Sequence, residues 1–285
     1  MRIRARLSVL ALGAGAGLVM LVCMGIPVAG QDQKGYKAPR MPGTEHPDLN
    51  GVYQAFTTAN WDILTHAAEA GPVPSLAGWF AMPAGPGIVE GNEIPYQPWA
   101  LKKKQENFKQ RLKVDPYHRE MGDSELKCFM PGVPRATYMP YPFQVLQGSS
   151  KYIMVAYEFA NTSRVIHMDD LPRADVDSWM GESRGRWEGD TLVVDVKGFN
   201  DMTWFDRAGN FHSEDLHVVE RYTPMSPYHL MYEATIEDPK VFTRPWKMRF
   251  PLYRRIEPGA RLMEFKCVEF ADELIYGRFR ARPSK

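Results

Sequence analysis

The second half of the chain alternates apolar and polar residues in one short segment after another. Seven or eight such segments follow Tyr141, and no stretch of helical periodicity separates them. Alternation with a period of two predicts β-strands that bury one face. Parallel strands need long crossover connections, so we expect these strands to pair antiparallel. The predicted strands cover residues 143–147, 153–159, 164–168, 187–196 (a hairpin with Glu188-Gly189-Asp190 at its tip), 216–222, 230–236, 246–252 and 262–270.

So many consecutive strands predict a closed sheet, because closure removes the unpaired edges that invite aggregation. The expected fold class is mainly β, with an up-and-down antiparallel barrel over residues 141–285. A barrel of this size has room for one small ligand at most. A β-sandwich is the alternative that the same strand pattern allows.

Residues 31–140 are predicted to form a loop-rich, partly helical extension that packs with the barrel as one globular unit. A short strand is expected at 51–56, followed by a short helix that Asn60 caps. A second helix is expected to begin at Pro98 and to run to about Lys113. The Gly- and Pro-rich residues between these helices either form a lid over the barrel mouth or plug an open edge of the core. Trp79, Phe80 and Met82 are the lid candidates.

Residues 1–30 have the composition of an export signal. A basic region at 2–6 precedes an apolar run at 7–22, and 28–30 resembles a small-residue cleavage site. We therefore predict a cleaved signal peptide, a periplasmic or secreted protein, and no stable membrane insertion after cleavage. The uncharged part of the segment is also long enough for an uncleaved anchor. Lipid modification of Cys23 is a third alternative.

Two of the three cysteines, Cys128 and Cys267, remain after cleavage. An oxidising compartment favours a disulfide between them, and two buried free thiols are the alternative. The net charge of +1 gives no indication of a nucleic-acid partner. The chain also has no GxxxxGK, GxSxG or HExxH motif. These absences count against nucleotide-dependent, α/β-hydrolase and zinc-peptidase chemistry, and we expect no cofactor.

The loop at 200–213 is the predicted reactive site, because charged residues and His lie there beside Trp204 and Phe205. An Asp beside a His suits general acid–base catalysis, so Asp206 and His212 are the candidate pair. Arg207 or Arg244 is the candidate partner for a carboxylate or a developing oxyanion. The alternative is structural, since Asp, Asn and Gly also build turns, and Arg244 precedes a proline at a strand entrance.

Aromatic and polar residues on the strands complete the predicted site. The expected ligand-contacting residues are Trp204, Phe205, Tyr138, Tyr232, His217 and Trp246. His212, Glu214 and His217 are the residues that could form a metal site in this region. The cluster contains no Cys and no His pair at a regular spacing, so we predict no metal.

Several motifs together resemble a large family of exported, mostly uncharacterised proteins of soil and aquatic bacteria. The motifs lie at 47–51 (PDLNG), 96–99 (YQPW), 131–135 (PGVPR), 185–194 (GRWEGDTLVV) and 243–246 (TRPW). The resemblance covers most of the mature chain and implies export and a lipocalin-like barrel. The WEGDTL hairpin is also loosely similar to hairpins of calycin barrels. The resemblance implies no activity and no catalytic residue.

Two functions follow from this sequence. The first is an exported enzyme that performs cofactor-independent acid–base chemistry, of lyase, isomerase or hydrolase type, on a small hydrophobic or aromatic molecule in the barrel. The second is a lipocalin-like carrier that binds such a molecule without transforming it. A structural envelope protein with a filled barrel is a third alternative. The density of charged groups in the loop at 200–213 favours the enzyme.

Overall fold

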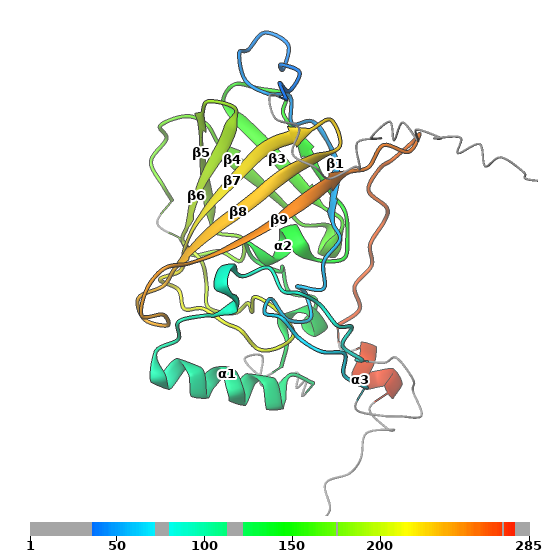
Figure 1. Ribbon diagram of the computed structural model, residues 1–285, viewed down its shortest axis with the longest axis vertical. Coiled ribbons are helices and arrows are strands. Elements are labelled where there is room, and N and C mark those ends of the chain that lie inside the picture. Colours follow the sequence, from blue (N-terminus) through cyan, green and yellow to red (C-terminus); the bar gives the residue numbers. More distant parts are fainter. Residues whose placement is uncertain (1–35, 72–79, 113–121, 175, 270, 277–285) are drawn as a thin grey trace, which may run out of the picture.

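The computed structural model describes residues 36–71, 80–112, 122–174, 176–269 and 271–276 (Figure 1). The predicted signal peptide at 1–30 lies outside these residues, as does Trp79 of the predicted lid. None of the helices in the described ranges has the length and apolar character needed to cross a membrane.

A closed barrel of nine strands dominates the structure, which confirms the predicted fold class. Each strand pairs with the next along the chain, and β9 returns to β1. The strands are β1 (Gly51–Ala55), β2 (Phe143–Leu146), β3 (Tyr152–Tyr157), β4 (Ser163–His167), β5 (Glu182–Glu188), β6 (Thr191–Lys197), β7 (His217–Ser226), β8 (His229–Glu237) and β9 (Trp246–Arg254).

The pairing of β4 with β5 departs from a purely antiparallel barrel. These strands run parallel, with Ile166 opposite Ser183 and His167 opposite Arg184. The described residues 168–174 and 176–181 contain no helix, and the chain returns along the barrel between the two strands, so β5 begins at the same end as β4. The remaining strand pairs are antiparallel, and Gly189 and Asp190 form the predicted tight turn between β5 and β6.

The strand that closes the barrel comes from the extension. β1 lies at 51–55 and pairs antiparallel with both β2 and β9. The predicted last strand at 262–270 is wrong, because residues 262–269 form no strand. The physical reason is that β1 already occupies the edge of β9, which leaves that strand no free hydrogen-bonding edge for a later segment.

None of the described helices belongs to the barrel wall, which is made of strands. The predicted second helix is confirmed as α1 (Pro98–Gln110), with proline in its first turn. The short helix expected after Asn60 is wrong, since the chain makes a turn in which Trp61 N donates to Thr58 O. The other helical segments are α2 (Arg135–Tyr138), α3 (Ala271–Tyr276), and the 3₁₀ turns η2 (Glu90–Asn92), η3 (Ser124–Lys127) and η4 (Phe159–Asn161).

The predicted disulfide between Cys128 and Cys267 is present. It joins the segment just before α2 to the chain that follows β9. Crosslinks of this kind persist in oxidising compartments. The bond therefore holds residues 255–269, which contribute no strand, against the rest of the protein.

The two ends of the barrel differ (Figure 1). Strand directions place the β6–β7 and β8–β9 connections at one end, which α1 and the loops of the extension cover. We call this the closed end. The β2–β3 and β5–β6 turns lie at the other end, beside the loop at 36–50. We call this end the mouth.

Candidate functional site

His212 lies at the closed end with both ring nitrogens engaged. Its Nδ1 lies 2.9 Å from Ser213 O, and its Nε2 lies 2.7 Å from Thr203 Oγ1. A carbonyl oxygen only accepts, so Nδ1 donates and Nε2 accepts the hydroxyl proton. Burial lowers the pKa of His212, which keeps the ring neutral at pH 7. These bonds leave neither nitrogen free to contact a ligand.

Asp206 is fully buried nearby and holds two segments together. Its Oδ2 accepts from Ile63 N at 2.9 Å and from Asn210 Nδ2 at 2.6 Å, and its Oδ1 accepts from Asn210 N at 3.1 Å. Burial, with a further contribution from Asp62, raises the pKa of Asp206 to about 7. A carboxyl with this pKa has the proton affinity of a general acid or base. Its oxygens, however, bind protein donors.

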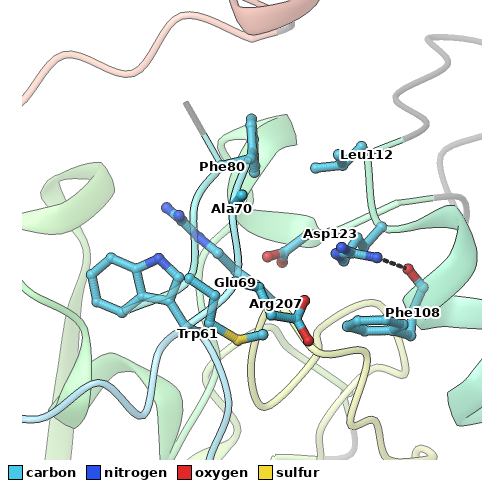
Figure 2. Close-up of a pocket in the computed structure, with 10 residues that line it drawn as sticks. Trp61, Glu69, Ala70, Phe80, Phe108, Leu112, Asp123 and Arg207 are labelled. Carbon is cyan, nitrogen blue, oxygen red and sulfur yellow. Dashed lines mark hydrogen bonds between the residues drawn. The ribbon is translucent and has the colours of Figure 1, made fainter. Parts of the chain in front are cut away.

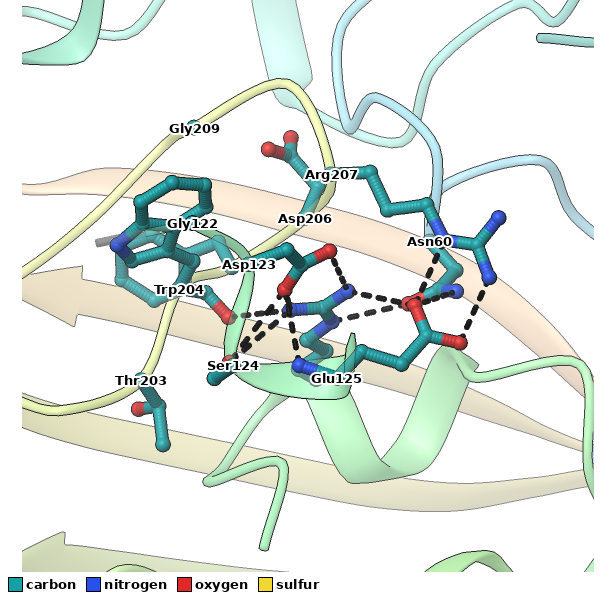
Figure 3. A network of polar contacts seen from close by, with 12 residues as sticks. Asn60, Gly122, Asp123, Ser124, Glu125, Thr203, Trp204, Asp206, Arg207 and Gly209 are labelled. Atoms are coloured by element: carbon teal, nitrogen blue, oxygen red, sulfur yellow. Dashed lines mark hydrogen bonds and ion pairs between the residues drawn. The ribbon is translucent and has the colours of Figure 1, made fainter. Parts of the chain in front are cut away.

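Arg207 takes part in a buried ionic network at the closed end (Figure 3). Its Nε and Nη2 donate to the two carboxylate oxygens of Glu125 at 2.7 and 2.8 Å. Arg135, which is 1 % exposed, donates to the same carboxylate at 3.0 Å and forms a bidentate pair with Asp123. Asn60 bridges Arg135 and Glu125. The network therefore joins four segments: the turn after β1, η3, α2 and the loop at 200–213.

The charges in this network compensate one another. Burial alone raises the pKa of Glu125, but the neighbouring Arg207 and Arg135 lower it to about 2. Removal of one charged residue from such a buried network leaves the opposite charge of its partner uncompensated. No functional role is predicted for Arg135 from the sequence, although this residue lies in the PGVPR motif at 131–135.

A small cavity adjoins the network (Figure 2). Trp61, Phe80, Leu112 and Arg207 line it, and its volume is about 30 Å³. A water molecule needs roughly 10–15 Å³ of such space. The cavity therefore has room for a few water molecules and is too small for an aromatic ligand.

Some of the other predicted contact residues pack together in the core, where the ring of Phe205 lies 5.6 Å from that of Trp246 and 5.4 Å from that of His212, and others lie apart from them. Tyr138, Phe205, Tyr232 and Trp246 are buried in the core, and Trp204 is 8 % exposed. Tyr138 donates to Phe205 O at 2.7 Å. His217 lies on the outer barrel surface, with Nε2 2.7 Å from Asp195 and Nδ1 3.1 Å from Glu237. Arg244 is exposed at the closed end, 3.9 Å from Glu93. The structure thus does not bring these residues to one cavity, and their roles stay predictions.

A buried ion pair occupies the middle of the barrel. Arg164 makes a bidentate pair with Glu220 at 2.7 and 3.0 Å. Tyr222 and Tyr232 each donate to the same carboxylate at 2.9 Å. These residues come from β4, β7 and β8, and all are buried. Side chains therefore fill the centre of the barrel.

The mouth contains a cavity of about 650 Å³. Ile153, Met168 and Trp187 supply apolar surface, Gln147, His46 and Ser149 add polar groups, and Asp170 and Arg186 add charged ones. Ligand pockets for small organic molecules span roughly 300–1,000 Å³ and combine a mainly apolar lining with a few polar groups. Gly185 is part of the wall, and a Cβ there would lie 2.4 Å from Met168 Sδ. The absence of a side chain at this position therefore lets the chain pass close to Met168.

Residues 40–47, the cap loop, cover this cavity. Arg40 and Pro47 pair as an isolated bridge, and Met41 N donates to His46 O at 2.9 Å. A salt bridge joins Arg40 to Asp190 in the β5–β6 turn. Near its base the loop places His46 on Trp187, with parallel rings whose centroids lie 4.8 Å apart. The sequence predicts a lid in a different segment, 71–98, and does not indicate the cap loop.

The sequence also missed His46, Gln147 and Trp187 as candidate ligand contacts. The WEGDTL motif, which begins at Trp187, was the available signal. A position near the predicted N-terminus of the mature chain does not indicate that a residue lines a cavity. A position at the end of a strand does not indicate it either. Their common location follows only from closure of the barrel by β1.

No protein-family model, no curated protein and no solved structure matches this chain. The resemblance to a family of exported bacterial proteins therefore stays a prediction. The closed barrel itself is established by the strand pairing.

Proposed function

We propose that the protein is an exported, lipocalin-like carrier that binds one small, mainly apolar and flat molecule at the barrel mouth. The observation that carries this proposal is the cavity of about 650 Å³ beneath the cap loop. Its volume suits a ligand of two or three fused rings, and the stacked His46 and Trp187 offer aromatic surface beside it.

The bonding at the closed end favours a carrier over an enzyme. Acid–base catalysis needs a group within hydrogen-bond reach of the substrate. The ring nitrogens of His212 bind Thr203 and Ser213, and the small cavity that Arg207 lines has room for only a few waters. The acid–base pair of Asp206 and His212 gains no support from this arrangement. The disulfide between Cys128 and Cys267 supports export.

Titration with the fluorescent, neutral, flat dye 1-aminoanthracene tests the proposal. We expect saturable one-to-one binding in the micromolar range. Gly148 lines the cavity, and a Cβ there meets no atom within 4 Å. The Gly148→Trp variant should place an indole in open space at the cavity and weaken binding by at least about tenfold, which corresponds to about 1.4 kcal/mol.

Arg244→Ala is the matched control, because Arg244 is exposed and lies at the closed end. This variant should bind the dye as the wild type does. Two results would count against the proposal: no saturable binding to the wild type, or unchanged affinity in Gly148→Trp. A selective loss of affinity in Arg244→Ala would instead favour a ligand at the closed end.

A further inference from the structure

The wall of the mouth cavity includes one buried amide, that of Gln147, which follows β2 directly. Gln147 is 5 % exposed, although it is a polar residue at the entrance of a barrel. Buried polar atoms are nearly always hydrogen-bonded in folded proteins. The partners of this side chain therefore indicate what the cavity is built to hold.

One end of the amide has a fixed partner. Gln147 Oε1 accepts a hydrogen bond from Leu49 N at 2.9 Å. A backbone N–H only donates, so the atom that faces it must be the carbonyl oxygen, and the orientation of the amide is determined. The backbone of Gln147 is held too, because Gln147 N donates to Asn50 Oδ1 at 2.7 Å and Asn50 Nδ2 donates to Gln147 O at 3.2 Å.

The other end of the amide has no acceptor among the described residues. Among the described residues, Gln147 Nε2 takes part in no hydrogen bond, and it is also absent from the set of fully enclosed atoms that have no partner. It therefore reaches accessible space, and the space that Gln147 lines is the mouth cavity. Two N–H donors are thus held in a fixed direction beside an apolar and aromatic wall.

From these contacts we infer that the ligand is a flat aromatic compound with a neutral oxygen acceptor, such as a ketone or another conjugated carbonyl, that receives a hydrogen bond from Gln147 Nε2. This inference rests on the proposed function, since it concerns the same cavity. The aromatic part lies against Trp187, and Gln147 is the residue that sets specificity. A site built to donate a hydrogen bond discriminates against an analogue that lacks the acceptor, because its own donor is then left unpaired.

A pair of nearly isosteric ligands tests the inference. 2-Acetylnaphthalene carries a carbonyl oxygen, and 2-isopropenylnaphthalene has a methylene group in its place. Each is measured by displacement of 1-aminoanthracene from the wild type. We expect the ketone to bind about five to ten times more tightly than the alkene, as one neutral hydrogen bond allows. Equal affinities for the two compounds would overturn the inference and leave the proposed function intact, whereas displacement by neither would count against both.

The Gln147→Met variant removes the donor and keeps a side chain of similar length. The ratio of the two affinities within each variant is the readout, so a general loosening of the cavity cancels. We expect the preference for the ketone to disappear in Gln147→Met and to persist in Ile153→Val, which alters the same cavity without changing a polar group. A preference that persists in Gln147→Met would assign the hydrogen bond to another residue and overturn the role of Gln147.

An infrared measurement on the wild type covers the case in which Gln147→Met does not fold. The carbonyl stretching band of bound 2-acetylnaphthalene should lie at lower wavenumber than in cyclohexane, because a hydrogen bond weakens the C=O bond. A band at the cyclohexane position would show that the carbonyl receives no hydrogen bond in the cavity, and would overturn the inference without any variant.

Discussion

The imidazole of His46 lies parallel to the indole of Trp187, with ring centroids 4.8 Å apart and an angle of 5° between the planes. His46 belongs to the cap loop, and Trp187 lies near the end of β5. The stacked pair therefore connects the cover of the mouth cavity to its wall. Both residues line this cavity.

Removal of the stacked imidazole should loosen the cap loop. An aromatic pair of this geometry contributes about 0.5–1.5 kcal/mol beyond burial. In His46→Ala we expect 1-aminoanthracene to bind about threefold to tenfold more weakly, mainly through faster dissociation, which stopped-flow fluorescence measures. His167→Ala, on the outer face of β4, is the control. An unchanged dissociation rate in His46→Ala would show that the cap loop does not retain the ligand.

Neutralising Glu125 should destabilise the fold. Its carboxylate compensates the positive charges of Arg135 and Arg207. The Glu125→Gln variant therefore removes one of the negative charges that these two guanidinium groups need. The expected loss is about 3–5 kcal/mol in the free energy of unfolding, measured by urea denaturation. Glu214→Gln, which removes an exposed partner of Lys240, should change stability by less than about 1 kcal/mol. Equal losses in the free energy of unfolding of the two variants would show that burial does not determine how much an ion pair contributes.

The same carboxylate should make stability depend on acid pH. Burial raises its pKa, but Arg207 and Arg135 together bring it from 4.5 to about 2 in the folded protein. A folded pKa below the unfolded one means that the contribution is present above about pH 4.5 and is lost as the pH falls toward about 2. At about 1.4 kcal/mol per pH unit, the effect is on the order of 3 kcal/mol. The stability difference between wild type and Glu125→Gln should therefore shrink over this pH window, and a constant difference would contradict this assignment.

Reduction of the disulfide should destabilise the protein. Cys128 and Cys267 are 139 residues apart in sequence, so the bond restricts the unfolded chain strongly. Loss of a native disulfide typically costs about 2–5 kcal/mol. We expect a reductant to lower the urea midpoint of the wild type and to leave that of the double variant Cys128→Ser/Cys267→Ser unchanged. Identical midpoints of the reduced and oxidised wild type would show that the bond adds no stability.

The barrel could be predicted from sequence because its strands alternate regularly. Leu230, Tyr232, Ala234 and Ile236 of β8 all face inward, as their spacing indicates. The direction of β5 could not be predicted, since residues 168–181 return the chain without a helical signal. The pattern at 262–270 also alternates, but a strand needs a free edge as well as a pattern, and β1 had taken that edge.

The candidate site was harder to predict than the fold. Asp206 and His212 are close in sequence and chemically suited to catalysis, yet each satisfies its hydrogen bonds inside the protein. Local sequence indicates which groups are present but not which partners they find. His46, Gln147 and Trp187 come from three separate segments, and only closure of the barrel brings them to one cavity.

A crystal structure of the protein in complex with 2-acetylnaphthalene would show directly whether the barrel mouth holds the ligand. We expect one ligand there, with its rings against Trp187 and its carbonyl oxygen about 2.9 Å from Gln147 Nε2. A mouth cavity that contains only water at saturating ligand, or a ligand bound instead at the closed end beside Arg207, would contradict this expectation.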